Sequence, residues 1–82
     1  MASKHASFYS CKAGRTDTVK GHRTRTAAEE AAGEMGQIWV AAEKRQYQVH
    51  RRHGGGWVTV DPEPGWSTDL RSALVEKGLI DA

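Results

Sequence analysis

The sequence has a single cysteine, few aromatic side chains and no long apolar run. Because Cys11 is the only cysteine among 82 residues, an internal disulfide is excluded, which favours a reducing, cytoplasmic setting. Residues 1–6 contain no apolar stretch, which argues against a secretory signal. The roughly 20 apolar residues that a membrane span requires occur nowhere. We therefore expect a cytoplasmic protein without a membrane partner.

The chain is also short for a protein with an enclosed reaction chamber. We expect one domain over residues 1–82, with a flexible N-terminus at 1–5. A chain of this size buries only about 60–65% of its unfolded surface. This leaves little room for a small-molecule cavity of about 300 Å³ or more. The outer surface is therefore expected to carry the function, and neither an enzyme nor a bound cofactor is predicted.

Hydrophobic periodicity predicts the order ββαβββα. Alternating or apolar stretches indicate strands, and alanine-rich or Leu-spaced stretches indicate helices. The strands are expected at 6–13, 16–25, 38–42, 47–52 and 57–60, and the helices at 26–36 and 69–77. The fold class is α+β: an antiparallel sheet of four to five strands with one or two helices packed on one face.

Capping and turn residues set the expected element boundaries. Thr26 and Glu29 form a capping box at the start of the first helix, and Gly36 is its expected stop. Residues 43–46 are expected to form the turn after the third strand. Residues 61–66 form a Pro/Gly connector to the C-terminal helix, which Ser67 or Thr68 caps and Gly78 ends.

The formal net charge of +2 is unevenly distributed: residues 1–25 and 37–53 are basic, and 26–36 and 54–82 are acidic. If the hairpins share one sheet, their cations form a positive face that can release counterions from a nucleic-acid backbone. The alternative is that these charges are solvated and keep edge strands from pairing. The candidate partner-binding residues are the basic Arg15, Lys20, Arg23, Arg25, Lys44, Arg45, Arg51 and Arg52 and the acidic Glu29, Glu30 and Glu34.

The remaining motifs favour structural roles. The run Gly54-Gly55-Gly56 can direct backbone amides at an anion, but it is more typical of a tight hairpin. His50 and His53 match no zinc spacing, so no metal site is predicted. Cys11 lies within a strand, away from any helix N-terminus, and is expected to be a small core residue. No catalytic residue is assigned.

Three tryptophans have two possible uses. Trp39 and Trp57 lie on expected strands, and Trp66 precedes the last helix. Each is expected in the core. A tryptophan exposed beside Arg51 or Arg52 would instead be a stacking platform for bases or an anchor at a protein interface.

The middle of the chain resembles a known group of small proteins. An alanine-rich helix up to Gly36, the strand around Ile38, Trp39 and Val40, and the hairpin through residues 54–56 are similar in order and size to small phage-encoded anti-CRISPR proteins. The resemblance covers about residues 6–60 and is one of architecture. It implies inhibition by docking onto a CRISPR effector, and the acidic residues Glu29, Glu30 and Glu34, or Asp61 and Glu63, would make that contact.

The sequence therefore predicts a small non-enzymatic binding protein. One hypothesis is a phage or mobile-element inhibitor that docks on a host protein or nucleoprotein complex. The first alternative is a protein that binds nucleic acid directly through basic β-hairpins. The second is a small structural or assembly subunit that forms a homo-oligomer.

Overall fold

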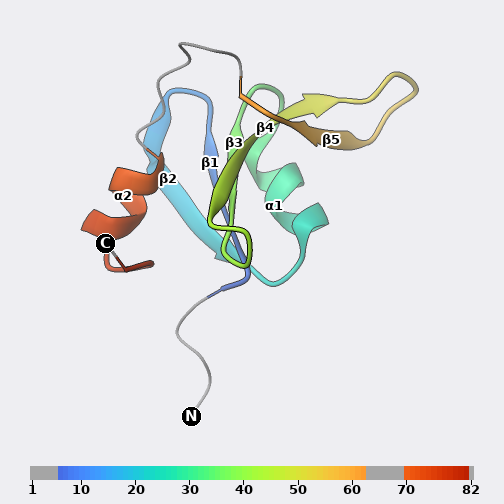
Figure 1. Cartoon of the computed structure of the whole chain (residues 1–82). Coiled ribbons are helices and arrows are strands. Elements are labelled where there is room, and N and C mark those ends of the chain that lie inside the picture. The colour runs from blue at the N-terminus through green and yellow to red at the C-terminus, as the bar shows by residue number, and fades with distance from the viewer. Residues whose placement is uncertain (1–5, 63–69, 82) are drawn as a thin grey trace.

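The protein forms one five-stranded antiparallel sheet with one helix packed against each face (Figure 1). The computed structural model describes residues 6–62 and 70–81. In order, its elements are β1 (Phe8–Lys12), β2 (Arg15–His22), α1 (Arg25–Ala32), β3 (Gln37–Val40), β4 (Arg45–Arg51), β5 (Trp57–Val60) and α2 (Leu70–Glu76). The predicted α+β class and the order ββαβββα are confirmed. No helix within these residues is long and apolar enough to cross a membrane.

The sheet has the strand order β2-β1-β3-β4-β5, so β3 is central and β2 and β5 are the edges. All four residues of β3 are buried, as expected for an apolar strand covered on both sides. Trp39 of β3 lies opposite Tyr9 of β1 on one side and opposite Gln46 of β4 on the other. The two predicted hairpins therefore share one sheet, but β2 and β5 lie at opposite edges of it.

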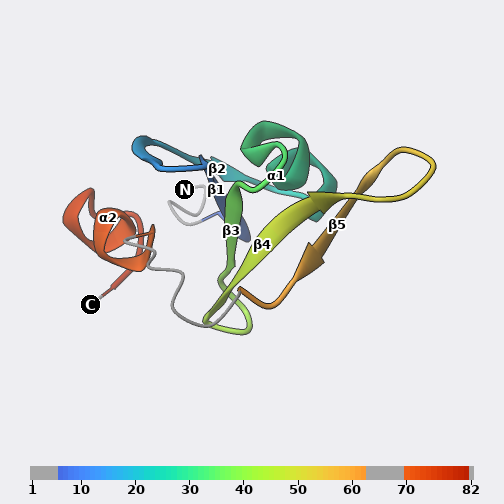
Figure 2. The same cartoon turned by 90° about the horizontal axis from the view of Figure 1, so that it is seen from above.

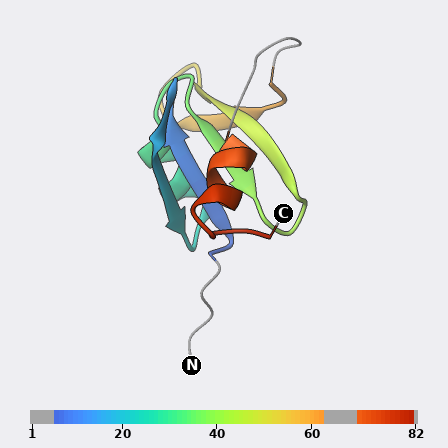
Figure 3. The same ribbon diagram turned by 90° about the vertical axis from the view of Figure 1, so that its left-hand side faces the viewer.

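Successive residues of the central strands point to opposite faces, and each face has its own buried cluster. On one face, Tyr9, Cys11 and Trp39 pack against Leu70 and Leu74 of α2. On the other, the side chains of β3 and β4 that pack against Ala28 and Ala32 of α1 are Ile38, Val40 and Val49. Figures 2 and 3 show α1 and α2 on opposite sides of the sheet. The prediction that the helices share one face is therefore corrected: both faces are apolar, and each needs its own cover.

The first helix begins and ends earlier than the sequence indicated. Its N-cap is Thr24, whose backbone is extended and whose hydroxyl accepts a hydrogen bond from the Ala27 amide at 3.2 Å. The expected capping box at Thr26 is therefore wrong, because Thr26 already lies inside the helix. The helix ends at Gly33, whose φ of 73° suits glycine, and not at Gly36.

Gly36 instead permits a close approach between α1 and the sheet. A Cβ atom at this position would lie 2.3 Å from the carbonyl oxygen of Ala32. That separation is far inside van der Waals contact, so only glycine fits without moving the helix. The glycine that the sequence suggested as a helix stop is thus a packing residue.

The other boundaries differ by a few residues. The turn between β3 and β4 is at 41–44 and not at 43–46, because Arg45 already pairs with Val40. The expected end of α2 is confirmed: Gly78 has a φ of 74°, and the Leu79 amide donates to the Leu74 carbonyl at 2.8 Å. Residues 1–5, most of the 61–66 connector with Trp66, and the caps Ser67 and Thr68 lie outside the described residues.

The position of the helix cap can be tested by two matched substitutions. Thr24→Ala removes the hydroxyl that accepts the Ala27 amide, so we expect the free energy of unfolding to fall by about 1 kcal/mol. Thr26→Ala is expected to change it by no more than about 0.5 kcal/mol, because the residue is exposed and alanine is a good helix former. Urea denaturation followed by circular dichroism measures both. Equal losses, or a larger loss at Thr26, would contradict this assignment.

Candidate functional site

Arginines and aromatic rings meet on the side of the sheet that α1 covers. The guanidinium carbons of Arg25 and Arg45 lie 5.2 and 5.4 Å from the ring centre of Tyr47, within the range of cation–π attraction. Arg25 comes from the first turn of α1, and its Nη2 donates to Oγ1 of Thr59 on β5 at 3.0 Å. This hydrogen bond ties the start of the helix to the edge strand and holds the guanidinium over the ring.

A second arginine–aromatic pair lies further along the same strands. Arg51 on β4 is directly opposite Trp57 on β5, and its guanidinium carbon lies 4.6 Å from the tryptophan ring. Trp57 and Tyr47 are partly buried because both pack against the buried cluster under α1, which we call the α1-side cluster: Ala28, Ala32, Ile38, Val40 and Val49. We call these five residues the arginine–aromatic strip: Arg25, Arg45, Tyr47, Arg51 and Trp57.

Carboxylates neutralise one end of the strip. Arg45 forms an exposed ion pair with Asp61 at 2.5 Å. The Tyr47 hydroxyl donates to the carboxylate of Glu43, and this hydrogen bond raises the tyrosine pKa. At the other end, the structure gives Arg51 and Arg52 no ion-pair partner among the described side chains. Arg51, which lies over Trp57, and its sequence neighbour Arg52 therefore carry positive charge that no ion pair with a described side chain offsets.

Residues 50–58, which we call the arm, extend beyond the rest of the sheet. The β3–β4 ladder ends where Gln37 pairs with Gln48, followed by backbone hydrogen bonds from Val49 to Gly36 and from Met35 to Val49. From His50 onward, β4 pairs only with β5. Figures 1 and 2 both show this hairpin projecting from the molecule.

Glu34 supports the root of the arm. Its Oε2 accepts the Arg51 amide at 2.7 Å, in the place where a further strand would have supplied an acceptor. Its Oε1 lies 3.1 Å from Nδ1 of His50. Beyond the point where β4 has a neighbour on both sides, the Arg51 amide is its first backbone donor without a strand partner, and the Glu34 carboxylate accepts it. Glu34 was predicted as a partner-binding residue, but its carboxylate makes these contacts within the protein.

The other two acidic candidates, Glu29 and Glu30, lie on α1. Glu29 is partly buried, and this burial raises its pKa, while the nearby charges of Arg25 and Arg52 act in the opposite direction. Glu30 is exposed. The three carboxylates therefore do not form a single free acidic surface.

The remaining basic candidates are dispersed. Arg15 and Lys20 lie on the edge strand β2, away from the arm, and Arg15 pairs with Asp17 at 2.9 Å. Arg23 is exposed just before the helix cap, and Lys44 lies in the β3–β4 turn. The expected continuous positive face of both hairpins is therefore not formed. Of the predicted cations, the structure groups Arg25, Arg45, Arg51 and Arg52.

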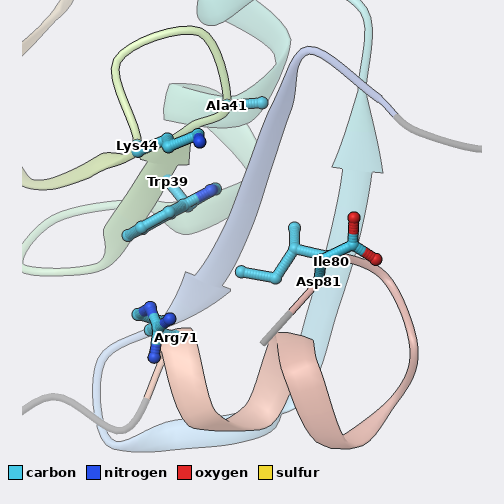
Figure 4. Close-up of a pocket in the computed structure, with 6 residues that line it drawn as sticks. All are labelled: Trp39, Ala41, Lys44, Arg71, Ile80 and Asp81. Carbon is cyan, nitrogen blue, oxygen red and sulfur yellow. The ribbon is translucent and has the colours of Figure 1, made fainter.

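A hollow of about 330 Å³ lies on the opposite side, near α2. Figure 4 shows the ring of Trp39 between the side chains of Lys44 and Arg71, with Ile80 and Asp81 across from it. Its three charged side chains are exposed, and their signs are mixed. Nothing in this arrangement fixes the orientation of a ligand as the buried polar groups of a small-molecule site do.

A serine–histidine contact lies on the α1 side of β1 and β2. Oγ of Ser10 is 2.8 Å from Nε2 of His22, and burial, helped by the charge of Lys20, lowers the pKa of the histidine. Nucleophilic catalysis also needs a group that orients the histidine and donors for an oxyanion. Within the described residues, no carboxylate contacts His22, and no cluster of three or more potential metal ligands occurs. The pair joins the two strands.

Cys11 is a core residue, as predicted. It is 2% exposed and packs in the cluster under α2. Burial raises the pKa of its thiol to about 11, although a hydrogen bond from the backbone of Gln37 offsets part of this effect. The thiol is therefore protonated at neutral pH and is a poor nucleophile.

The raised pKa of Cys11 makes stability depend on pH. Because the folded pKa of about 11 exceeds the ordinary value of 9.0, the unfolded state loses its thiol proton first as pH rises. The free energy of unfolding should therefore fall between pH 9 and pH 11, by up to about 2–3 kcal/mol. Denaturant titrations at several pH values should show a smaller alkaline loss for Cys11→Ala than for the unmodified protein. Parallel pH profiles would contradict this account.

Two residues of this site were not identified from the sequence: Tyr47 of the strip, and Thr59, which accepts the hydrogen bond from Arg25. Tyr47 was expected on a strand but was not given a functional role, although Arg45 two residues earlier is a signal for a same-face pair. Thr59 had no signal, because its partner Arg25 is 34 residues away. Trp57 lies beside Arg51, but it is partly buried, so it meets only in part the prediction of an exposed tryptophan beside Arg51 or Arg52.

No protein-family model, curated protein or solved structure matches this chain. The candidate function therefore rests on the geometry of its own residues.

Proposed function

We propose that this protein is a non-enzymatic binding protein that contacts the phosphate backbone of a nucleic acid through the arginine–aromatic strip and the arm. The observation that carries the proposal is the set of three guanidiniums held over Tyr47 and Trp57, next to Arg52. Guanidinium groups present several donors in a plane and suit phosphate oxygens well.

The rings reduce the ordering cost of such contacts. A free arginine side chain loses about 2 kcal/mol of rotamer entropy when it is fixed. Arg51 already lies over Trp57, and Arg25 is held by both Tyr47 and Thr59. A surface with side chains in place before binding retains more of its interaction energy as affinity.

The distribution of carboxylates supports a basic contact surface. The arm contains Arg51 and Arg52 and no acidic residue. Docking through Glu29, Glu30 and Glu34, which the resemblance to anti-CRISPR proteins implies, has less support. Glu34 is bonded to the arm, and Glu29 lies near Arg25 and Arg52. Glu30 is exposed and forms no ion pair with a described side chain.

The proposal predicts binding that weakens with salt and depends on two arginines. Fluorescence anisotropy with a labelled oligonucleotide at 50–200 mM salt gives the slope of log affinity against log salt. Each phosphate contact contributes about 0.7–0.9 to this slope. The double variant Arg51→Gln/Arg52→Gln removes two such contacts and should therefore lower its magnitude by about 1.4–1.8. Glutamine retains part of the side chain that covers Trp57, so the fold should be preserved.

The matched control is Lys44→Gln/Arg71→Gln, which removes the same charge near the hollow of Figure 4. Its slope of log affinity against log salt should remain within about 0.5 of the slope for the unmodified protein. Equal slopes for both double variants would show a non-specific charge effect and contradict the proposal. Absence of binding at 50 mM salt would also contradict it, and capture of a CRISPR effector that Glu30→Lys abolishes would favour docking on a protein instead.

A further inference from the structure

The arm has the shape of a narrow two-stranded ribbon. Beyond Val49 it is held by the pairs His50↔Val58 and Arg51↔Trp57, and then by hydrogen bonds that close the loop between Arg52 and Gly56. At about 3.4 Å per residue, residues 50–52 extend it by roughly 10 Å. This length is comparable to the depth of the major groove of B-form DNA, about 8.5 Å.

The tip of the arm has little bulk. Gly54, Gly55 and Gly56 all have positive φ angles, between 74° and 99°, so the tight turn depends on glycine. A Cβ atom built at any of them would meet nothing within 4 Å. The end of the ribbon is therefore slender, and the side chains of Arg51, Arg52 and His53 stand next to it.

The aromatic residues of the strip are poorly suited to stacking with bases. Both Tyr47 and Trp57 pack against the α1-side cluster and have a guanidinium over the ring. Trp39 is 7% exposed. Proteins that bind single strands generally offer open aromatic faces, which these three rings do not.

We infer that the nucleic acid is duplex DNA and that the arm enters its major groove, with Arg51 and Arg52 directed at the phosphates and base edges of the groove. This inference rests on the proposed function. The major groove, about 12 Å wide, admits a two-stranded ribbon in undeformed B-form DNA, whereas the minor groove, about 6 Å wide, must first be widened at a cost in free energy. The major groove of an RNA duplex is too deep and narrow for side chains to read.

The first test compares four labelled probes in the anisotropy assay at 50 mM salt. They are a DNA duplex, one of its single strands, an RNA duplex of the same sequence, and the DNA duplex with glucosylated hydroxymethylcytosines, whose sugars fill the major groove. We expect the plain DNA duplex to bind at least about tenfold more tightly than each of the other three. Stronger binding of the single strand or the RNA duplex would overturn the inference, as would equal affinity for the glucosylated duplex.

A single substitution refines the test. Arg52→Gln should weaken binding to the plain duplex several-fold but leave the weak binding to the glucosylated duplex unchanged, because the arm cannot enter that groove. A similar loss on both duplexes would overturn the placement of the arm. The outcomes separate the two proposals: if all four probes fail to bind, the proposed function fails, whereas binding without preference for the open major groove rejects only the inference.

Discussion

Burial of β3 on both faces is the constraint on which the rest of the structure depends. Ile38 and Val40 point to one side and Trp39 to the other, and all are less than a tenth exposed. Each such side chain contributes about 1.5–3 kcal/mol when it is fully buried. Because both sides of the strand are apolar, the sheet needs a helix on each face. That requirement places α1 across β1, β3 and β5 and leaves α2 on the side away from the arginine–aromatic strip.

Helix α1 connects the core to the candidate site. Its buried face is formed by Ala28 and Ala32, and these small side chains let it lie close to the sheet. The Gly36 contact requires the same closeness. As a result, the start of the helix delivers Arg25 to Tyr47, and the segment after it delivers Glu34 to the root of the arm. The packing of small residues therefore sets the position of charged ones.

Local patterns predicted most of the fold. The alternation Tyr47, Val49, Arg51 assigned the faces of β4 correctly, and the glycine run marked the loop before β5. The helix cap was misplaced because both Thr24 and Thr26 are acceptable N-caps, and only the end of β2 at His22 decides between them. The run Ile38-Trp39-Val40 marked a strand with two apolar faces, but it did not specify which helix covers each face, so the placement of α2 was not predicted.

The candidate site was predicted only in part, because its contacts join distant segments. The sequence analysis allowed for a tryptophan beside Arg51 or Arg52 without specifying which one, and the hairpin brings Trp57 opposite Arg51 over a short loop. The approach of Arg25 to Tyr47 depends on how α1 crosses the sheet, which charge patterns do not encode. Arg15 and Lys20 were grouped with the others by sign alone, but the strand order puts them at the far edge.

The separation of the two buried clusters has a consequence for motion. Leu70 and Leu74 of α2 cover Tyr9, Cys11 and Trp39, whereas the strip lies over the other cluster. The C-terminal layer can therefore lift from the sheet in a local opening that leaves the α1 side in place. Such an opening uncovers the sulfur of Cys11, so the rate at which a thiol reagent labels the folded protein reports how often the layer detaches.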